Sequence, residues 1–199
     1  MINKGKLVIS LDFELLWGMR DKRTIDSYGK NILGGRDAVS KMLDIFTEFN
    51  VVATFATVGF LFAKDKEELF AFSPESKPKY DDKNLSAYNG HLDLIGNNEN
   101  EDKYHYAGSL IEEVKKYPNQ EIASHTFCHY YCLESGQDIV DFKEDMTAAI
   151  AIAEKKDIKL ESLVFPRNQY NKEYLEVCKN LGITSYRGNE KVWFNKAES

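Results

Sequence analysis

The sequence predicts an α/β fold built on a parallel sheet, either an α/β barrel or an open doubly wound sheet. Short apolar runs rich in β-branched residues alternate along the chain with segments of helical periodicity. No two-residue hairpin signal separates the runs, and this alternation favours parallel strands joined by right-handed crossovers. In both architectures ligands bind at the carboxyl ends of the strands.

Five apolar runs are predicted as strands. The first, KLVISLDF, is almost continuously apolar, as in a strand buried on both faces of a parallel sheet. The others are rich in β-branched and aromatic residues or follow directly on helical segments. The predicted strands are 6–13, 51–60, 121–127, 161–166 and 183–188.

Four helices are predicted between these strands, at 38–49, 106–118, 140–157 and 171–182. Gly34 and Gly35 precede the first helix, Pro118 ends the second and Gly182 stops the fourth. Residues 64–103 are polar and turn-rich apart from a short helical pattern, KDKEELFAF. We interpret them as an insertion within a single domain of residues 1–199, because long loops in compact domains are usually lids or binding loops.

The composition excludes several classes of protein. The net charge is −6 and no basic block occurs, which argues against a nucleic-acid partner. No apolar run is long enough to cross a membrane, and the N-terminal residues reach acidic side chains too early for a signal peptide, so we expect a cytoplasmic protein. The three cysteines, Cys128, Cys132 and Cys178, are predicted to be reduced thiols. The oligomeric state is not predictable.

Polar side chains follow three of the predicted strands and should meet at one edge of the sheet. They are Asp12 and Glu14 after the first strand, His125 and His129 after the third, and Arg167 with Asn168 after the fourth.

Two imidazoles four residues apart can face one cation, and Glu14 would complete a set of two histidines and one carboxylate. Such a set leaves positions open for water and substrate on zinc or a similar divalent ion. Asp12 could then act as general base, held ionised and oriented by a bidentate pair with Arg167. Considered alone, the histidine pair is more often structural, Asp12 could cap a turn, and Arg167 could form a salt bridge at the rim.

A rival zinc site uses His125, Cys128, His129 and Cys132, which would share one helical face. Four ligands are hard to close onto so short a segment, so we favour buried, apolar roles for both cysteines. Trp17, Tyr130 and Tyr131 flank the predicted ligands and either stack on a sugar or pack in the core. His91 and His105 are predicted to be solvated.

These motifs together resemble the polysaccharide deacetylase family, also called the NodB homology domain or carbohydrate esterase family 4. SLDFELLWG resembles its first motif, EIASHTFCH its His-x-x-x-His motif, and VFPRNQ the position of its base-tethering arginine. LDIFTEFNVVATFATVGFL and LEVCKNLGITSYRG are similar to neighbouring helices and strands of the family. The family has adjacent aspartates where this chain has Asp-Phe-Glu, so an exchange of roles between Asp12 and Glu14 stays open.

The resemblance implies a deformed (β/α) barrel of the NodB type, incomplete at its C-terminal end. It implies a hydrolase of non-peptide carbon–nitrogen bonds that removes acetyl groups from N-acetylated sugars of a polysaccharide or its precursor. Asp12 and Arg167 correspond to catalytic residues and His125 and His129 to metal ligands. Glu14 is expected to complete the metal site, with zinc the favoured ion.

Trp17, Tyr130 and Asn168 are the predicted substrate contacts. The later family motifs, including a Leu-x-His whose histidine is the general acid, have no match before Ser199. We expect a truncated chain, while substitution by a residue such as His105 stays open. Two other functions also stay open: a non-sugar amide hydrolase on the same barrel, and a metal-free carbohydrate-binding domain without full activity.

Overall fold

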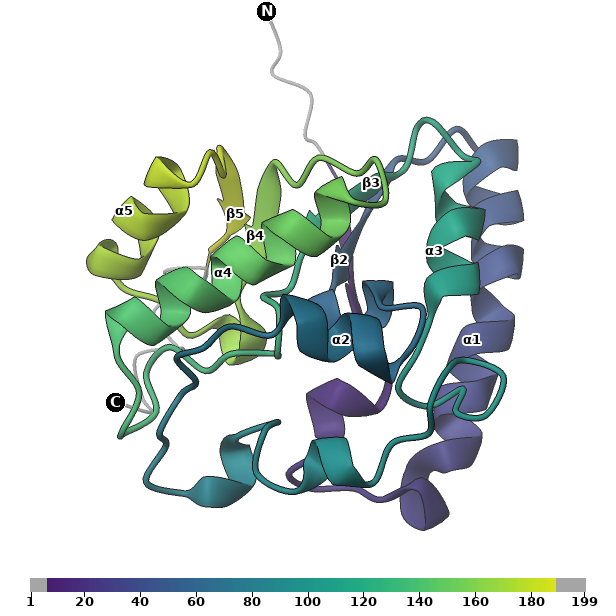
Figure 1. The fold of residues 1–199 in the computed structure, drawn as a ribbon. Coiled ribbons are helices and arrows are strands. Elements are labelled where there is room, and N and C mark those ends of the chain that lie inside the picture. Colours follow the sequence, from purple (N-terminus) through teal and green to yellow (C-terminus); the bar gives the residue numbers. More distant parts are fainter. Residues whose placement is uncertain (1–6, 189–199) are drawn as a thin grey trace, which may run out of the picture.

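The computed structural model describes residues 7–188 and contains one curled parallel sheet with helices outside it (Figure 1). Its five strands are β1 (Ile9–Phe13), β2 (Ala53–Thr57), β3 (Glu121–Ser124), β4 (Ser162–Val164) and β5 (Ser185–Arg187). They pair in chain order, β1-β2-β3-β4-β5, and every pairing is parallel. The sheet is half of a barrel, and the predicted parallel α/β fold is confirmed. The predicted first strand began at Lys6, which lies outside the described residues, as do the residues that follow Gly188.

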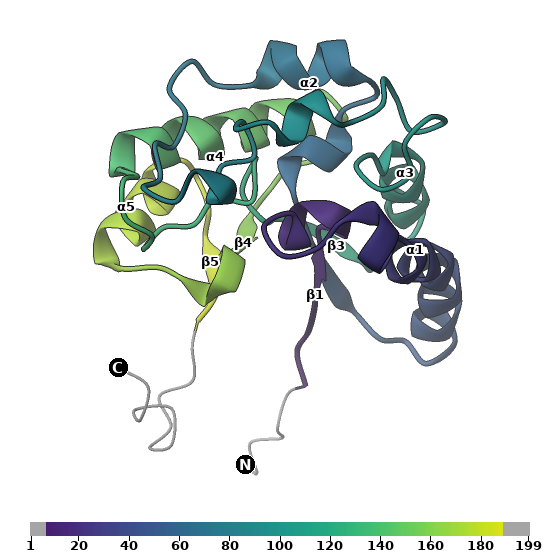
Figure 2. The same ribbon diagram turned by 90° about the horizontal axis from the view of Figure 1, so that it is seen from below.

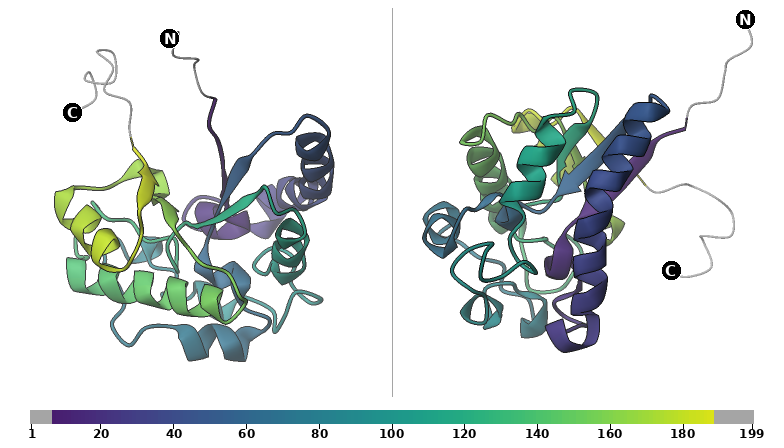
Figure 3. Two further views of the ribbon diagram at one scale, coloured as in Figure 1. Left: turned by 90° about the horizontal axis from the view of Figure 1, so that it is seen from above. Right: turned by 90° about the vertical axis from the view of Figure 1, so that its right-hand side faces the viewer.

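The helices form an arc around the sheet, from α1 and α3 on one side through α2 to α4 and α5 on the other (Figures 2 and 3). Their bounds are α1 (Ile25–Glu48), α2 (Lys66–Phe72), α3 (Gly108–Lys115), α4 (Ile139–Glu154) and α5 (Lys172–Asn180). Each strand-to-strand connection therefore contains a helix, as the sequence pattern predicted.

Helix α1 begins thirteen residues earlier than predicted. Thr24 caps its N-terminus through a reciprocal pair of hydrogen bonds with Ser27, so the helix starts in a polar segment without an apolar stripe. Gly34 and Gly35, predicted to precede the helix, lie in its exposed middle. Glycine within a helix costs about 1 kcal/mol relative to alanine, which the capped, 24-residue helix tolerates.

Residues 64–103 contain α2, which was predicted, and two short 3-10 turns at Lys83–Leu85 and His91–Asp93. Within residues 7–188, no helix is both long and apolar enough to cross a membrane.

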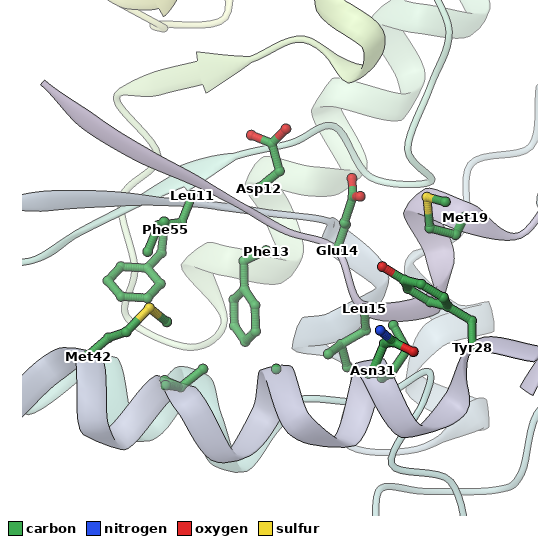
Figure 4. A pocket seen from close by; sticks show the side chains of 13 residues that line it. Leu11, Asp12, Phe13, Glu14, Leu15, Met19, Tyr28, Asn31, Met42 and Phe55 are labelled. Carbon is green, nitrogen blue, oxygen red and sulfur yellow. The ribbon is translucent and has the colours of Figure 1, made fainter. Parts of the chain in front are cut away.

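Strand β1 is an edge strand and is only partly buried, so the prediction of burial on both faces is wrong for it. Phe13 points toward α1, whereas Asp12 and Glu14 point to the opposite side of the strand (Figure 4). A cavity of about 340 Å³ lies between β1 and α1 and is lined by apolar residues including Leu11, Met42 and Phe55. The alternation along β1 thus separates an apolar side from a side that carries both carboxylates.

Candidate metal centre

Glu14, His125 and His129 meet at the carboxyl ends of β1 and β3. Glu14 directly follows β1 and begins a 3-10 turn, Leu15–Met19, that leads away from the strand. His125 directly follows β3, and the chain then bends so that His129 returns beside it, with ring centroids 4.9 Å apart. Of the two backbone shapes considered from the sequence, a helical turn or a bent loop, the loop is present.

One carboxylate oxygen contacts both imidazoles. Glu14 Oε2 lies 3.1 Å from His125 Nε2 and 2.9 Å from His129 Nε2. The three atoms that could bind a metal lie within 4.8 Å of one another, and no other group of three such side chains occurs among the described residues. The rings are almost fully buried, and the Glu14 side chain is 23% exposed. The site is therefore enclosed on the histidine side and open on the side of Glu14.

The pKa shifts of Glu14 and His129 favour the protonation states that bind a cation. Burial by itself raises the pKa of Glu14, but hydrogen bonds and charge interactions with His125 and His129 outweigh it and lower the pKa to about 2. Burial lowers the pKa of His129 to about 4, against the opposing effect of Glu14. At neutral pH the site thus contains an ionised carboxylate and a neutral His129.

The contacts of His125 fit a metal ligand. Its Nδ1 lies 2.8 Å from the carbonyl oxygen of Val164, which can only accept, so Nδ1 carries a proton and donates it. In the neutral form of this tautomer, the Nε2 lone pair faces Glu14 Oε2. Two acceptors 3.1 Å apart repel each other unless a proton or a metal cation lies between them. A divalent cation would relieve this repulsion, and the donated Nδ1 proton is the usual arrangement around a metal-bound histidine.

His129 has a different partner on its Nδ1. Arg20, which is buried, places Nη1 3.3 Å from this atom and also donates to the carbonyl of Trp17. A guanidinium only donates, so Nδ1 of His129 accepts and its proton lies on Nε2, facing Glu14. For His129 to bind a cation through Nε2, this proton must leave. Glu14, His125 and His129 therefore fit a divalent cation, provided that the Nε2 proton of His129 leaves when the cation binds.

The predicted pair between Asp12 and Arg167 is wrong. Asp12 instead forms a bidentate pair with Arg187 at the end of β5, with Nη1 2.8 Å from Oδ1 and Nη2 3.1 Å from Oδ2. Arg187 also donates to Ser10 Oγ and Asn168 Oδ1. The curl of the sheet brings β5 within reach of β1, and this approach across the sheet cannot be deduced from neighbouring motifs.

Arg167 forms rim salt bridges, which was the simpler of the two roles considered for it. It pairs with Asp21 and Glu134, and its guanidinium lies 4.1 Å from the centre of the Tyr131 ring. Arg167 and Asn168 both have left-handed backbone conformations, with φ of 53° and 52°. This sharp turn after β4 directs the Arg167 side chain toward Asp21 and away from Asp12.

Two of the predicted substrate contacts belong to the core. Trp17 and Tyr130 are both fully buried. Trp17 Nε1 donates to the carbonyl of His105, and the Tyr130 hydroxyl lies 2.9 Å from Gln137 Oε1 and 2.8 Å from the carbonyl oxygen of Asp138. Their polar atoms are satisfied inside the protein, so neither ring offers a face to a sugar. Asn168, the third, is partly exposed beside Arg187 and stays a prediction.

The remaining histidines and cysteines have structural contacts. His105 was predicted to be solvated but is buried, with Nδ1 2.8 Å from Asp102 Oδ2. His91 is half-buried, with Nε2 3.2 Å from the carbonyl of Asn84. Cys128 and Cys132 are buried free thiols, as favoured over the four-ligand zinc site.

Sequence reasoning missed Arg187 and Arg20 as residues of the site. Arg187 ends a predicted strand, so the rule that collected the other strand-end residues would have included it. Arg20 follows the first motif without any recognisable spacing, and no sequence signal identifies it.

The sequence of residues 24–186 matches the family described as polysaccharide deacetylase, and the chain belongs to this family. The match begins after Asp12 and Glu14, so the roles of these two acids depend on the geometry described above.

Solved structures share the fold. One is a protein from Mycobacterium smegmatis assigned to the polysaccharide deacetylases, with 15% identity and a TM-score of 0.55, covering 88% of this chain and 48% of that one. Another is a mutant of a carbohydrate esterase family 4 pseudoenzyme from Bacillus anthracis with restored enzymatic activity; it has 13% identity, a TM-score of 0.53 and coverage of 93% and 45%. IcaB from Ammonifex degensii has 12% identity, a TM-score of 0.52 and coverage of 92% and 60%. This chain spans about half the length of these structures, and the fold is that of an incomplete NodB-type barrel.

Proposed function

We propose that the protein is a metal-dependent deacetylase that removes the acetyl group from an N-acetylated sugar. The observation that carries this proposal is the meeting of Glu14 Oε2 with the Nε2 atoms of His125 and His129 at the carboxyl ends of β1 and β3, which both pair with β2. Family membership supplies the reaction class, and the donor set of two nitrogens and one oxygen favours zinc.

A divalent ion bound by Glu14, His125 and His129 would polarise the amide carbonyl and lower the pKa of water. The chain's own residues then have distinct tasks. Asp12 leaves the strand on the same side as Glu14 and is 39% exposed, so it can accept a proton from water beside the site. Arg187 fixes both oxygens of Asp12 through its bidentate pair, which orients the base.

His105, considered as a substitute general acid, is buried, donates its Nδ1 proton to Asp102 and packs its ring against Trp17. We therefore assign His105 a structural role. The acetylated saccharide as partner and the cytoplasm as location stay predictions.

The proposed function is tested by acetate release from a panel of N-acetylated sugars and oligosaccharides, with and without added zinc. We expect zinc-dependent acetate release from at least one sugar, and no release from the His125→Ala variant. Cyclic amides in the same panel distinguish a non-sugar amide hydrolase, which would cleave these and leave the sugars intact. Saccharide binding without zinc uptake or acetate release would contradict the proposal and indicate a binding domain.

A further inference from the structure

The backbone between the two histidines is held in a sharply bent shape. Thr126 and His129 have φ of 64° and 58°. These values lie in the left-handed region of the backbone, which residues other than glycine rarely adopt. Such conformations cost on the order of 1–3 kcal/mol each and persist only where the surroundings enforce them. The bend is what returns His129 to the side of His125, so whatever enforces it also sets the position of both rings.

Asp145 contacts this bend from α4. Its Oδ2 accepts the backbone N–H of Phe127 at 2.7 Å, and its Oδ1 accepts the backbone N–H of Cys128 at 3.0 Å. The Cys128 thiol also contacts the same carboxylate. One side chain thus binds the two residues at the centre of the His-x-x-x-His segment.

The Asp145 carboxylate is buried where it makes these contacts. Asp145 is 1% exposed, and burial raises its pKa to about 6 in spite of the hydrogen bonds that favour its charge. A buried carboxylate is unfavourable unless its acceptors are satisfied. Here its acceptors are satisfied by the bend, since both of its oxygens accept backbone N–H groups there.

The opposite side of the bend is fixed by the 3-10 turn Gly59–Phe62. Gly59 N donates to Thr126 O at 2.8 Å, and Phe60 N donates to Phe127 O at 3.0 Å. A Cβ atom on Gly59 would lie 2.7 Å from the Cα of Phe127, so only glycine allows this approach. The peptide groups of the bend are therefore held from two directions, their carbonyls by this turn and their N–H groups by Asp145.

We propose that Asp145 is a positioning residue of the metal centre, which shapes the 125–129 loop so that both imidazoles face one cation. This inference depends on the proposed function. Asp145 touches neither imidazole, so it acts only through the loop backbone.

The test uses Asp145→Asn and, as a matched control, Glu68→Gln. Glu68 is also a buried acid that accepts a backbone N–H, from Lys64, and it pairs with Lys155 and Lys156 away from the loop. Zinc affinity is measured by titration of the metal-free proteins, thermal unfolding gives their stability, and amide hydrogen exchange reports protection at Phe127 and Cys128.

We expect Asp145→Asn to lower zinc affinity on the order of 10–100-fold. It should also lose protection at Phe127 and Cys128, because its NH₂ group faces an N–H donor. Glu68→Gln should lose stability without losing zinc affinity. If Asp145→Asn does not fold, Asp145→Glu replaces it; this variant keeps the charge but moves the carboxylate by one methylene, and the same loss of affinity is expected.

Zinc affinity equal to that of the wild type in the Asp145 variant would overturn the inference, as would an equal loss of affinity in Glu68→Gln. A wild-type protein that takes up no zinc would instead refute the proposed function. In that case the exchange data decide the inference on their own: unchanged protection at Phe127 and Cys128 would show that Asp145 does not shape the loop.

Discussion

Two carboxylates in an apolar strand are tolerated because each has a partner. Asp12 in β1 and Glu14 directly after it point to one side of the chain, and Phe13 between them points to the other. Glu14 reaches the two histidines, and Asp12 reaches Arg187. A buried or half-buried carboxylate is costly unless it is paired. The sequence SLDFELLWG therefore encodes two adjacent polar contacts on one side of the strand.

Gly18 is required for the position of the Glu14 carboxylate. A Cβ atom added to Gly18 would lie 1.9 Å from Glu14 Cδ, so the carboxylate must move. We predict that Gly18→Ala lowers zinc affinity on the order of 10–100-fold. Its effect on the free energy of unfolding should be small, because the obstructing group is the end of a flexible side chain. Calorimetric titration and thermal unfolding measure the two effects.

Gly34→Ala is the control for this prediction. Gly34 lies in α1, and an added Cβ meets nothing within 4 Å. Alanine there should stabilise the protein by about 0.4–1 kcal/mol without any change in zinc binding. Equal zinc affinities for Gly18→Ala and Gly34→Ala would refute the role given to Gly18.

The lowered pKa of His129 predicts a pH dependence of stability in the metal-free protein. The pKa is about 4 in the folded state and 6.5 ordinarily, so between these values the unfolded chain binds a proton that the folded chain does not. The stability contribution present above pH 6.5 is lost as the pH falls toward 4, by at most about 1.4 kcal/mol per pH unit.

Comparison with His129→Gln isolates this contribution, because both proteins share the other titrating groups. Urea unfolding at pH 7, 6 and 5 should show the wild type losing stability relative to the variant as the pH falls. Parallel stability profiles would contradict the assignment of a buried, neutral His129.

At the scale of elements, β5 contributes the arginine that orients Asp12. We predict that Arg187→Gln lowers kcat/KM for deacetylation on the order of 10–100-fold and leaves zinc affinity unchanged, because Asp12 is not a ligand. The Asp12 and Arg187 side chains are 39% and 32% exposed, so stability should change by no more than about 1 kcal/mol.

Arg167→Gln is the matched comparison, since VFPRNQ suggested Arg167 for the same task. Its salt bridges are with Asp21 and Glu134, so kcat/KM should fall less than in Arg187→Gln. A larger fall in Arg167→Gln would show that the bidentate pair with Arg187 is not the one that orients the base.

The order of strands and helices was predictable because it depends on local periodicity. The grouping of Glu14, His125 and His129 was predictable as well, because the carboxyl ends of β1 and β3 lie at one edge of a parallel sheet whatever its curvature. The start of α1 was not predictable, because the helix begins with a capping box between Thr24 and Ser27 and its first turns carry no apolar stripe.

Side-chain partners across the sheet were not predictable. Arg167 and Arg187 both follow strands, and only the left-handed turn at Arg167 and the curl of the sheet determine which one reaches Asp12. Trp17 and Tyr130 flank the site in sequence, but both have hydrogen-bonding partners inside the core. Burial of an aromatic side chain depends on contacts far away in the sequence, as that between Trp17 and His105 shows.

At the scale of the whole molecule, the curled sheet has its edges at β1 and β5. The side chains of Asp12 and Arg187 connect these two edges. The chain spans about half the length of the structures that share its fold. The candidate metal centre, by contrast, lies at the carboxyl ends of β1 and β3, which both pair with β2, and does not involve the β5 edge.

Amide hydrogen exchange should reflect this arrangement. Strands β2 and β3 are paired on both sides, whereas β5 is short and pairs only with β4. We predict the slowest exchange in β2 and β3 and faster exchange in β5, because edge strands open at lower free energy. Uniform protection across all five strands would contradict a half-barrel with its edge at β5.

The most direct test of the metal centre is an anomalous difference map at the zinc edge from a crystal of the zinc-loaded protein. We predict one peak about 2.0–2.2 Å from the Nε2 atoms of His125 and His129 and from a carboxylate oxygen of Glu14. A zinc peak away from these three residues, or none in a crystal soaked at saturating zinc, would contradict this prediction.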